Sequence, residues 1–173
     1  MAILPILKYP DPLLLEVSEP VTEFDESLKK LSSDMIDTLK DAPGAGLAAP
    51  QIGKRIRLIV MDNSSLEDEQ YNDVITLVNP VIVHAEGKQV YMEGCLSVED
   101  LQSNVNRYLR VKVDYQDLYG NPKTIEASER RAVILQHEID HLDGVLFLDH
   151  LSPLKRELYI KRMRKQAKKP QKS

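Results

Sequence analysis

The clearest hydrophobic pattern near the N-terminus is that of an amphipathic helix. Apolar residues recur at helical spacing, at Leu28, Leu31, Met35, Ile36 and Leu39. Asp25 precedes them and is a favoured N-cap residue, because its carboxylate can accept from a free backbone N–H of the first turn. The pattern predicts a helix from Glu26 to a stop near Pro43. Residues 44–53, which follow, are rich in glycine and proline and predict a loop.

Runs of β-branched residues at 56–61 and 74–83 predict strands in the middle of the chain. Further strands are predicted at 89–92, 111–115 and 123–127. Apolar and polar residues alternate within 111–115, as in a strand that buries one face. The turn sequence YGNP at 119–122 predicts that the last two strands are neighbours.

Two more helices are predicted in the last third of the chain. Ser128 with Glu129 behind it marks an N-cap for a helix that continues to Leu142. Ser152 followed by Pro153 marks a second start, because proline suits the first helical position. This last helix leads into a Lys-rich tail, which we expect to be frayed.

The order helix, several strands, helix, helix favours an α+β fold, because the segments between strands are too short for repeated βαβ crossovers. We expect antiparallel and mixed β-sheets around the central helix, with one helix N-terminal and one C-terminal to it. Neither a repeat nor a long linker interrupts the pattern. Residues 1–173 are therefore predicted to form a single domain, with a basic C-terminal helix and tail at about 152–173.

Composition narrows the classes of function. Of 173 residues, 42% are hydrophobic and 29% are charged, which is typical of a globular domain. The net charge of −4 argues against a nucleic-acid-binding surface over the whole molecule. A single cysteine, Cys95, excludes an internal disulfide and suits a reducing compartment. Without a signal-peptide pattern or an apolar run near the roughly 18 residues of a membrane span, we expect a cytoplasmic protein with no membrane partner.

The strongest chemical signal is the pentapeptide HEIDH at 137–141, which has the form H-E-x-x-H. On a helix, His137 and His141 lie one turn apart on the same face, so both imidazoles can bind one metal ion. Glu138 lies beside them and can take a proton from a water that the ion activates. The alternative is a pair of surface histidines on an exposed turn. We favour the metal site, because the pattern falls within a predicted helix.

Two histidines leave the ion short of a protein ligand, and the third ligand separates enzyme classes. One class of zinc proteases has a third histidine six residues after the second, where this chain has Phe147. Another uses a glutamate on a later helix, but the candidate Glu157 lies among lysines and arginines. Cys95 is better, because thiolate binds zinc or ferrous iron strongly and Gly94 allows close backbone approach. A lone cysteine is usually a small buried residue with a structural role. Because the H-E-x-x-H motif here lacks a third ligand, we favour the metal-ligand interpretation of Cys95.

Three segments together resemble the signature motifs of peptide deformylases. They are GAGLAAPQ at 44–51, EGCLS at 93–97 and QHEIDHL at 136–142, in the order and spacing of that family. With similar flanking segments, the resemblance covers about residues 7–154. It implies an α+β metallohydrolase that removes the N-formyl group from the N-terminal methionine of newly synthesised polypeptides and releases formate.

The resemblance implies which residues bind the metal and move protons. Cys95, His137 and His141 would bind one divalent ion. In this family the ion is usually ferrous iron (Fe2+), and Zn2+, Ni2+ or Co2+ can substitute. Glu138 would be the general acid/base, first accepting a proton from water and then passing it to the departing amine.

The resemblance also implies contacts to the substrate, an N-formyl-methionyl nascent peptide. The side-chain amide of Gln51 and the backbone N–H of Leu96 would donate to the developing oxyanion. Gly46 would hydrogen-bond the extended peptide, and Ala45 and Val133 would help to line the methionine pocket.

The chain departs from the family pattern at three places. Ser97 is followed by Val-Glu-Asp at 98–100, where a proline is common two residues after the serine. Glu-Arg-Arg at 129–131 precedes the third motif, where small or apolar residues are common. Ala45 is smaller than the branched residue often found there, which predicts a wider pocket. All residues assigned to chemistry are present, so these departures bear on substrate preference rather than reaction type.

Two rival functions use the same residues differently. A zinc endopeptidase would cleave internal bonds of unformylated peptides. A binding module that docks on ribosomes and has lost catalysis would show no turnover with any metal. The second rival agrees poorly with the presence of Glu138, Cys95 and Gln51.

Two further features allow two interpretations each. Residues 155–172 are strongly basic and contain one acid, Glu157. This segment is either a solvated helix face with a disordered end or a docking surface for ribosomal RNA or protein, because phosphates attract Lys/Arg clusters. Arg107 either forms a buried pair with Glu93 or is a solvated surface arginine.

Overall fold

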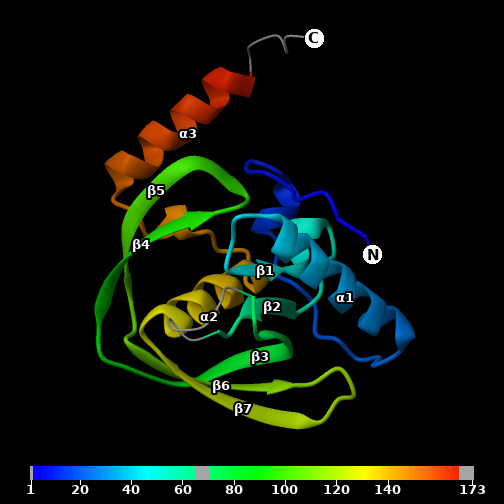
Figure 1. Cartoon of the computed structure of the whole chain (residues 1–173). Helices are drawn as coiled ribbons and strands as arrows, with labels where there is room; N and C mark the ends of the chain where they lie inside the picture. The colour runs from blue at the N-terminus through cyan, green and yellow to red at the C-terminus, as the bar shows by residue number, and fades with distance from the viewer. Residues whose placement is uncertain (1, 65–70, 168–173) are drawn as a thin grey trace.

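The computed structural model describes residues 2–64 and 71–167. Helix α2 (Glu129–Leu142) lies at its centre, between a five-stranded sheet and a separate two-stranded sheet (Figure 1). Helix α1 (Glu26–Asp41) and helix α3 (Pro153–Ala167) lie towards the outside. The predicted α+β class, with sheets around a central helix, is confirmed. Among the described residues, no helix has the length and apolar character needed to cross a membrane.

The five-stranded sheet has the order β1-β2-β3-β6-β7, and each neighbouring pair is antiparallel. Its strands are β1 (Gly46–Ala48), β2 (Leu58–Asp62), β3 (Val74–Glu86), β6 (Arg110–Gln116) and β7 (Pro122–Ser128). The two-stranded sheet is the antiparallel pair β4 (Gln89–Cys95) and β5 (Val98–Arg107). Short 3-10 helices cover Pro12–Leu15, Ala49–Ile52 and Phe147–His150.

All three helices start where the capping signals predict, and in two of them the side chain before the helix makes a capping hydrogen bond. The Asp25 carboxylate accepts from Leu28 N at 3.0 Å, and the Ser152 hydroxyl accepts from Lys155 N at 3.3 Å. Ser128 holds the predicted N-cap position of α2, although its side chain makes no capping hydrogen bond. The expected fraying of the Lys-rich tail concerns residues 168–173, which lie outside the described residues.

Two segments differ from the sequence-based expectation. The predicted loop at 44–53 contains β1, whose three residues pair with β2, and a 3-10 helix. Strand β5 was not predicted, because its sequence VEDLQSNVNR is mostly polar. Its pairing with β4 and the burial of alternate residues towards its C-terminal end stabilise the strand in spite of that composition.

One apolar cluster packs α2 against the large sheet. Its members with no exposed surface include Ile59, Met61, Leu77, Val113, Leu135 and Leu142. Burying a side chain of this kind is worth about 1.5–3 kcal/mol relative to exposure. The cluster therefore fixes the position of the helix that carries both motif histidines.

A buried ion-pair network joins the small sheet to α2. Arg107 Nε and Nη2 donate to the two carboxylate oxygens of Glu93 at 2.6 and 2.9 Å, and both side chains are 3% exposed. Arg107 Nη1 donates to Asp140 Oδ2 of α2 at 2.7 Å. The predicted buried pair of Arg107 and Glu93 is confirmed, and the alternative of a solvated arginine is wrong.

Replacing Arg107 should destabilise the folded protein strongly. Arg107→Ala leaves the Glu93 carboxylate buried without its partner, which typically costs about 3–5 kcal/mol. Chemical denaturation monitored by circular dichroism measures the loss. The matched control is Arg110→Ala, because Arg110 forms a single-contact pair with Glu86 in which both side chains are about half exposed, 55% and 51%. That control should change stability little, and equal effects of the two substitutions would contradict the prediction.

Candidate active site

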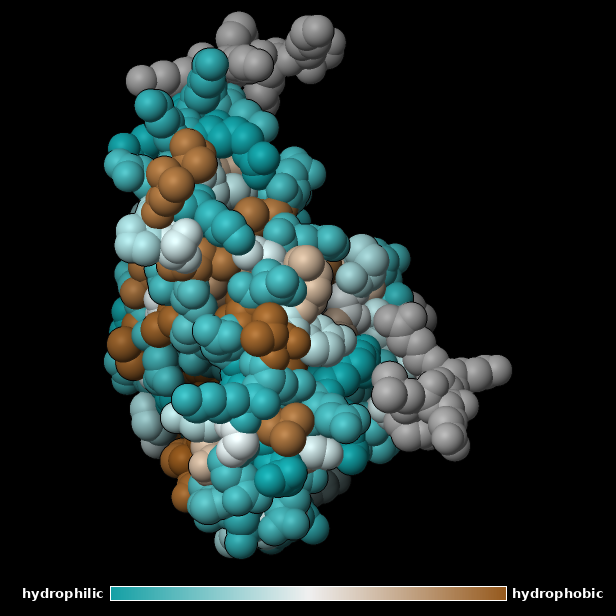
Figure 2. Space-filling model, turned by 90° about the vertical axis from the view of Figure 1, so that its left-hand side faces the viewer, coloured by the Kyte–Doolittle hydropathy of each residue, from teal (hydrophilic) through white to brown (hydrophobic). Residues whose placement is uncertain are grey.

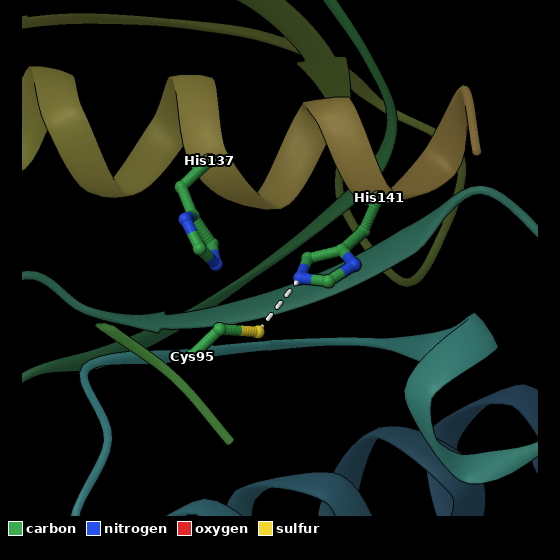
Figure 3. A group of neighbouring side chains, drawn as sticks. All are labelled: Cys95, His137 and His141. Atoms are coloured by element: carbon green, nitrogen blue, oxygen red, sulfur yellow. Dashed lines mark hydrogen bonds between the residues drawn. The ribbon is translucent and has the colours of Figure 1, made fainter. Parts of the chain in front are cut away.

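The structure brings together three side chains that lie far apart in the sequence. Cys95 ends β4, and His137 and His141 lie one turn apart on α2. Figure 3 shows both imidazole rings projecting from the helix towards the thiol. Cys95 Sγ is 3.4 Å from His141 Nε2, and one ligand atom from each residue lies within 4.8 Å of the other two. One sulfur and two imidazole nitrogens at this spacing can bind a divalent ion.

The two other positions considered from the sequence for a third ligand, 157 and 147, do not supply one. Glu157 is exposed on α3. Phe147 is 1% exposed, and its ring stacks on His137 with 6.1 Å between centroids. Phe147 therefore shields a histidine in the position where one protease class supplies a ligand.

A carboxylate orients one of the histidines. Glu93 Oε1 lies 2.8 Å from His137 Nδ1, which leaves the Nε2 of that ring for an ion. The sequence predicted a pair of Glu93 with Arg107 but not this second contact of Glu93 with His137. Glu93 and Cys95 are two residues apart at the end of β4, a spacing that places side chains on one face of a strand and could have indicated it.

The charges around the histidines are strongly coupled. Burial alone would raise the pKa of Glu93, but hydrogen bonds from Arg107 and His137 outweigh it and hold that pKa at about 2. Burial opposes the charged form of His137, yet contacts with Cys95 and Glu93 raise its pKa well above the usual value. Burial and the nearby charges of His137 and Arg107 lower the pKa of His141 well below its usual value. A metal ion would take the place of the His137 proton, because metal ligands must be deprotonated.

Glu138 is a buried carboxyl group beside the three ligands. It is 4% exposed, and its Oε1 lies 3.9 Å from His137 Nε2. Its Oε2 has no hydrogen-bond partner among the described residues. Burial raises the pKa of Glu138 to about 7, so the group can both accept and release a proton near neutral pH.

Gln51 is held with its amide nitrogen towards the sulfur. Its Oε1 accepts from Ala48 N at 2.9 Å, and its Nε2 donates to Ser97 Oγ at 3.1 Å. The same Nε2 lies 3.8 Å from Cys95 Sγ. Ser97, which is fully buried, is a partner that sequence analysis did not assign.

The N-terminal segment ties two of the motifs together. Leu7 N donates to Gln51 O at 2.6 Å, and Tyr9 N donates to Ser97 O at 2.7 Å. Between them, Lys8 Nζ donates to Leu96 O at 2.6 Å. The segment therefore helps to fix the Gln51 side of the site relative to the turn after Cys95.

Close packing explains one of the motif glycines but not another. A Cβ on Gly46 would lie 2.7 Å from Glu138 Cγ, so only glycine lets β1 approach α2 here. A Cβ on Gly94 would come no closer than 3.6 Å to its nearest neighbour, an ordinary contact. The close approach expected at Gly94 is not found.

A cavity of about 760 Å³ opens beside these groups. Its lining includes most residues singled out from the sequence, namely Ala45, Gly46, Gln51, Cys95, Leu96, Val133, His137 and Glu138. His141 is 1% exposed and does not line it. The cavity is large enough for several residues of an extended peptide.

Comparisons with known proteins agree with this geometry. The family model described as polypeptide deformylase matches residues 3–157. A peptide deformylase of Desulfotalea psychrophila is 52% identical over 165 residues, which are 95% of this chain and 97% of the relative. A peptide deformylase of Brucella suis is 48% identical over 168 residues, 96% of this chain and 95% of the relative.

Solved structures show the same fold. The crystal structure of a peptide deformylase from Legionella pneumophila is 47% identical and superposes with a TM-score of 0.84, covering 98% of this chain and 100% of that chain. The enzyme from Thermus thermophilus is 41% identical with a TM-score of 0.84, covering 95% of both chains. Because the family model, the sequence relatives and these structures agree along almost the whole length, the chain belongs to the peptide deformylase family.

Proposed function

We propose that the cavity beside α2 is the active site at which this chain removes the N-formyl group of N-formyl-methionyl nascent peptides. Peptide deformylases are metal-dependent hydrolases, and hydrolysis here yields formate and a free α-amine. The observation that carries the assignment is the convergence of Cys95, His137 and His141 next to the buried Glu138, whose Oε2 has no hydrogen-bond partner in the described part of the chain. We also propose that residues 1–173 act as one catalytic domain in the cytoplasm, which a single unpaired cysteine suits.

The ion would be held by the Cys95 sulfur and an imidazole nitrogen each of His137 and His141. Thiolate and imidazole suit both iron and zinc, and the resemblance to the family favours Fe2+, with Zn2+, Ni2+ or Co2+ as substitutes. When bound, such an ion supplies Lewis-acid chemistry, lowering the pKa of water towards about 7. Glu93 fixes the ring of His137 for this role through the contact at Nδ1.

Glu138 is the group that moves protons. It accepts one proton as water attacks the formyl carbon, and it returns a proton to the amine as the C–N bond breaks. The buried, unpartnered Oε2 and the raised pKa of about 7 support this double role.

Gln51 and Leu96 stabilise the negative charge that develops on the formyl oxygen. The amide of Gln51 is already oriented by Ala48 and Ser97, so donating to an oxyanion requires little reorganisation. The backbone N–H of Leu96 is the second donor, in the turn that Lys8 and Tyr9 hold.

The substrate extends away from the metal along β1. β1 is the edge strand of the large sheet, and an edge strand can pair with an extended peptide. Gly46 provides the backbone hydrogen bond, and Ala45 and Val133 line the methionine pocket.

The basic helix α3 is proposed to dock the enzyme on ribosomal RNA or protein. Its described residues include six lysines and arginines and one acid. Figure 2 shows a mainly hydrophilic surface at the top of the molecule, where α3 lies, interrupted by apolar side chains. Two apolar residues of α3, Leu154 and Leu158, are 67% and 58% exposed. Tyr159 anchors the helix, since it is 3% exposed and donates to Glu99 O at 3.0 Å.

The reaction is tested with a matched pair of substrates. Purified without oxygen and loaded with Fe2+, the protein should release formate from a formyl-Met peptide and leave the unformylated peptide intact. Cys95→Ala should lose both the bound metal, measured by elemental analysis, and the turnover, because two imidazoles hold the ion weakly. Cleavage of internal bonds in the unformylated peptide would instead support the endopeptidase, and turnover of neither peptide would support the binding module.

The oxyanion contact is tested at Gln51. Gln51→Ala should lower kcat by about 10²–10³, the usual cost of losing one oxyanion donor, while the bound metal stays. The control measurement is the unfolding midpoint, because Gln51 also bonds to Ala48 and Ser97. An unchanged kcat, or a fall that follows loss of metal, would remove Gln51 from the proposed role.

Docking is tested by charge reversal rather than truncation, because removing α3 also removes the buried Tyr159. Changing the exposed Lys161, Arg164 and Lys165 to Glu should abolish salt-sensitive co-sedimentation with ribosomes and leave formyl-peptide turnover unchanged. The matched control reverses three exposed lysines outside α3, namely Lys30, Lys40 and Lys54. Equal ribosome binding by both triple variants and the wild type would refute docking through α3.

A further inference from the structure

One wall of the cavity carries an arginine that the proposed reaction does not use. Arg130, Val133, Ile134 and His137 all line the cavity. Their spacing of three, four and seven residues places them on one face of α2. At 1.5 Å of rise per residue, Val133 lies about 6 Å and Arg130 about 10.5 Å along the helix from His137. Arg130 therefore marks the end of the cavity wall away from the metal site.

The surroundings of Arg130 leave N–H donors of its guanidinium available, although the carboxylate of the buried Asp62 lies nearby. The Arg130 side chain is 27% exposed, and its Nη2 lies 3.8 Å from Asp62 Oδ2. That distance is too long for a hydrogen bond, and a guanidinium has five N–H donors. The contact with Asp62 places the guanidinium near the end of β2. Asp62 N donates to Ala45 O at 2.8 Å, so this end of β2 lies next to the strand that the substrate would follow.

The opposite wall carries the other sign of charge. Glu99 and Asp100, from β5, also line the cavity. Glu99 is 57% exposed and pairs with Lys8 at 3.3 Å. The cavity lining therefore carries a basic residue, Arg130, from α2 and two acidic residues, Glu99 and Asp100, from β5.

An extended substrate presents particular side chains to each wall. Side chains alternate along an extended chain, so the first and third residues point to the same side and the second to the other. The third residue lies about 10 Å from the formyl carbon at roughly 3.3 Å per residue, which matches the position of Arg130. If the methionine side chain points towards Val133, the third side chain points towards Arg130.

We propose that Arg130 is a specificity-determining residue that favours nascent chains with an acidic third residue. This inference rests on the proposed deformylation at the same site. The carboxylate of Asp or Glu at the third position pairs with the Arg130 guanidinium, and a lysine there is repelled. An acidic second residue gains nothing, because it faces the wall that carries Glu99 and Asp100.

The test compares formyl-Met-Ala-Xaa-amide peptides in which Xaa is Glu, Gln or Lys. Wild-type kcat/KM should fall in the order Glu, Gln, Lys, with steps of about two- to fivefold, the size expected for a partly exposed ion pair. The differences should appear in KM rather than in kcat, because the contact is made equally in the ground state and the transition state. They should shrink in 0.5 M NaCl.

Charge reversal gives the decisive comparison. Arg130→Glu should invert the order, so that Lys becomes the preferred third residue within that variant. Arg131→Glu is the matched control, since Arg131 carries the same charge one residue on but does not line the cavity and instead contacts Asn63 Oδ1 at 3.3 Å. This control should keep the wild-type order.

The outcomes separate the inference from the proposed function. Two results would overturn the role of Arg130. One is that Arg130→Glu keeps the wild-type order of peptides, and the other is that Glu at the second position (formyl-Met-Glu-Gln-amide compared with formyl-Met-Gln-Gln-amide) raises kcat/KM as much as Glu at the third. Equal turnover of all formylated peptides would overturn that role too and leave deformylation intact. Failure to release formate from any of them would overturn both.

Discussion

The site requires that the end of β4 and helix α2 stay at a fixed distance from each other, and the contacts that hold them there bury charged side chains. Cys95 ends β4, whereas both histidines belong to α2, and no backbone hydrogen bond between these elements is found in the described residues. Arg107 makes the connection, since it contacts Glu93 on β4 and Asp140 on α2. Glu93 in turn contacts His137. One buried arginine therefore neutralises the carboxylate that orients a metal ligand, so the fold and the metal chemistry share an electrostatic network.

Two neighbouring buried carboxyl groups differ in their partners, and this difference separates their roles. Glu93 receives two donors from Arg107 and stays ionised, with a pKa of about 2. Glu138 lacks such a partner, and burial raises its pKa to about 7. The first group suits permanent orientation of an imidazole, and the second suits proton transfer. Gly46 is needed for this arrangement, because a side chain there would collide with Glu138.

An element or contact could be predicted from the sequence where neighbouring residues alone determine it. Helix α2 and its two histidines were predicted, because helical spacing brings residues 137 and 141 to one face whatever surrounds them. The strand at 111–115 was predicted from its alternation. Strand β5 and the short β1 were not, because their stability comes from pairing with β4 and β2 rather than from their own composition. The contacts of Glu93 with His137 and of Ser97 with Gln51 depend on packing between distant segments. The only local signal for them in the sequence is the two-residue spacing of Glu93 and Cys95, which places both side chains on one face of a strand.

Two of the departures from the family pattern contribute charged residues to the cavity. Residues 98–100 and 129–131 lie far apart in the sequence, yet Glu99, Asp100 and Arg130 line one cavity. Arg130 lies about 10.5 Å along α2 from His137, so its charge can influence which peptide binds without contacting the groups that move protons. Arg131, next in the chain, contacts Asn63 instead and does not line this cavity. Substrate preference can thus change through a single position on the cavity face of α2, while the apolar cluster behind the helix keeps the histidines in place.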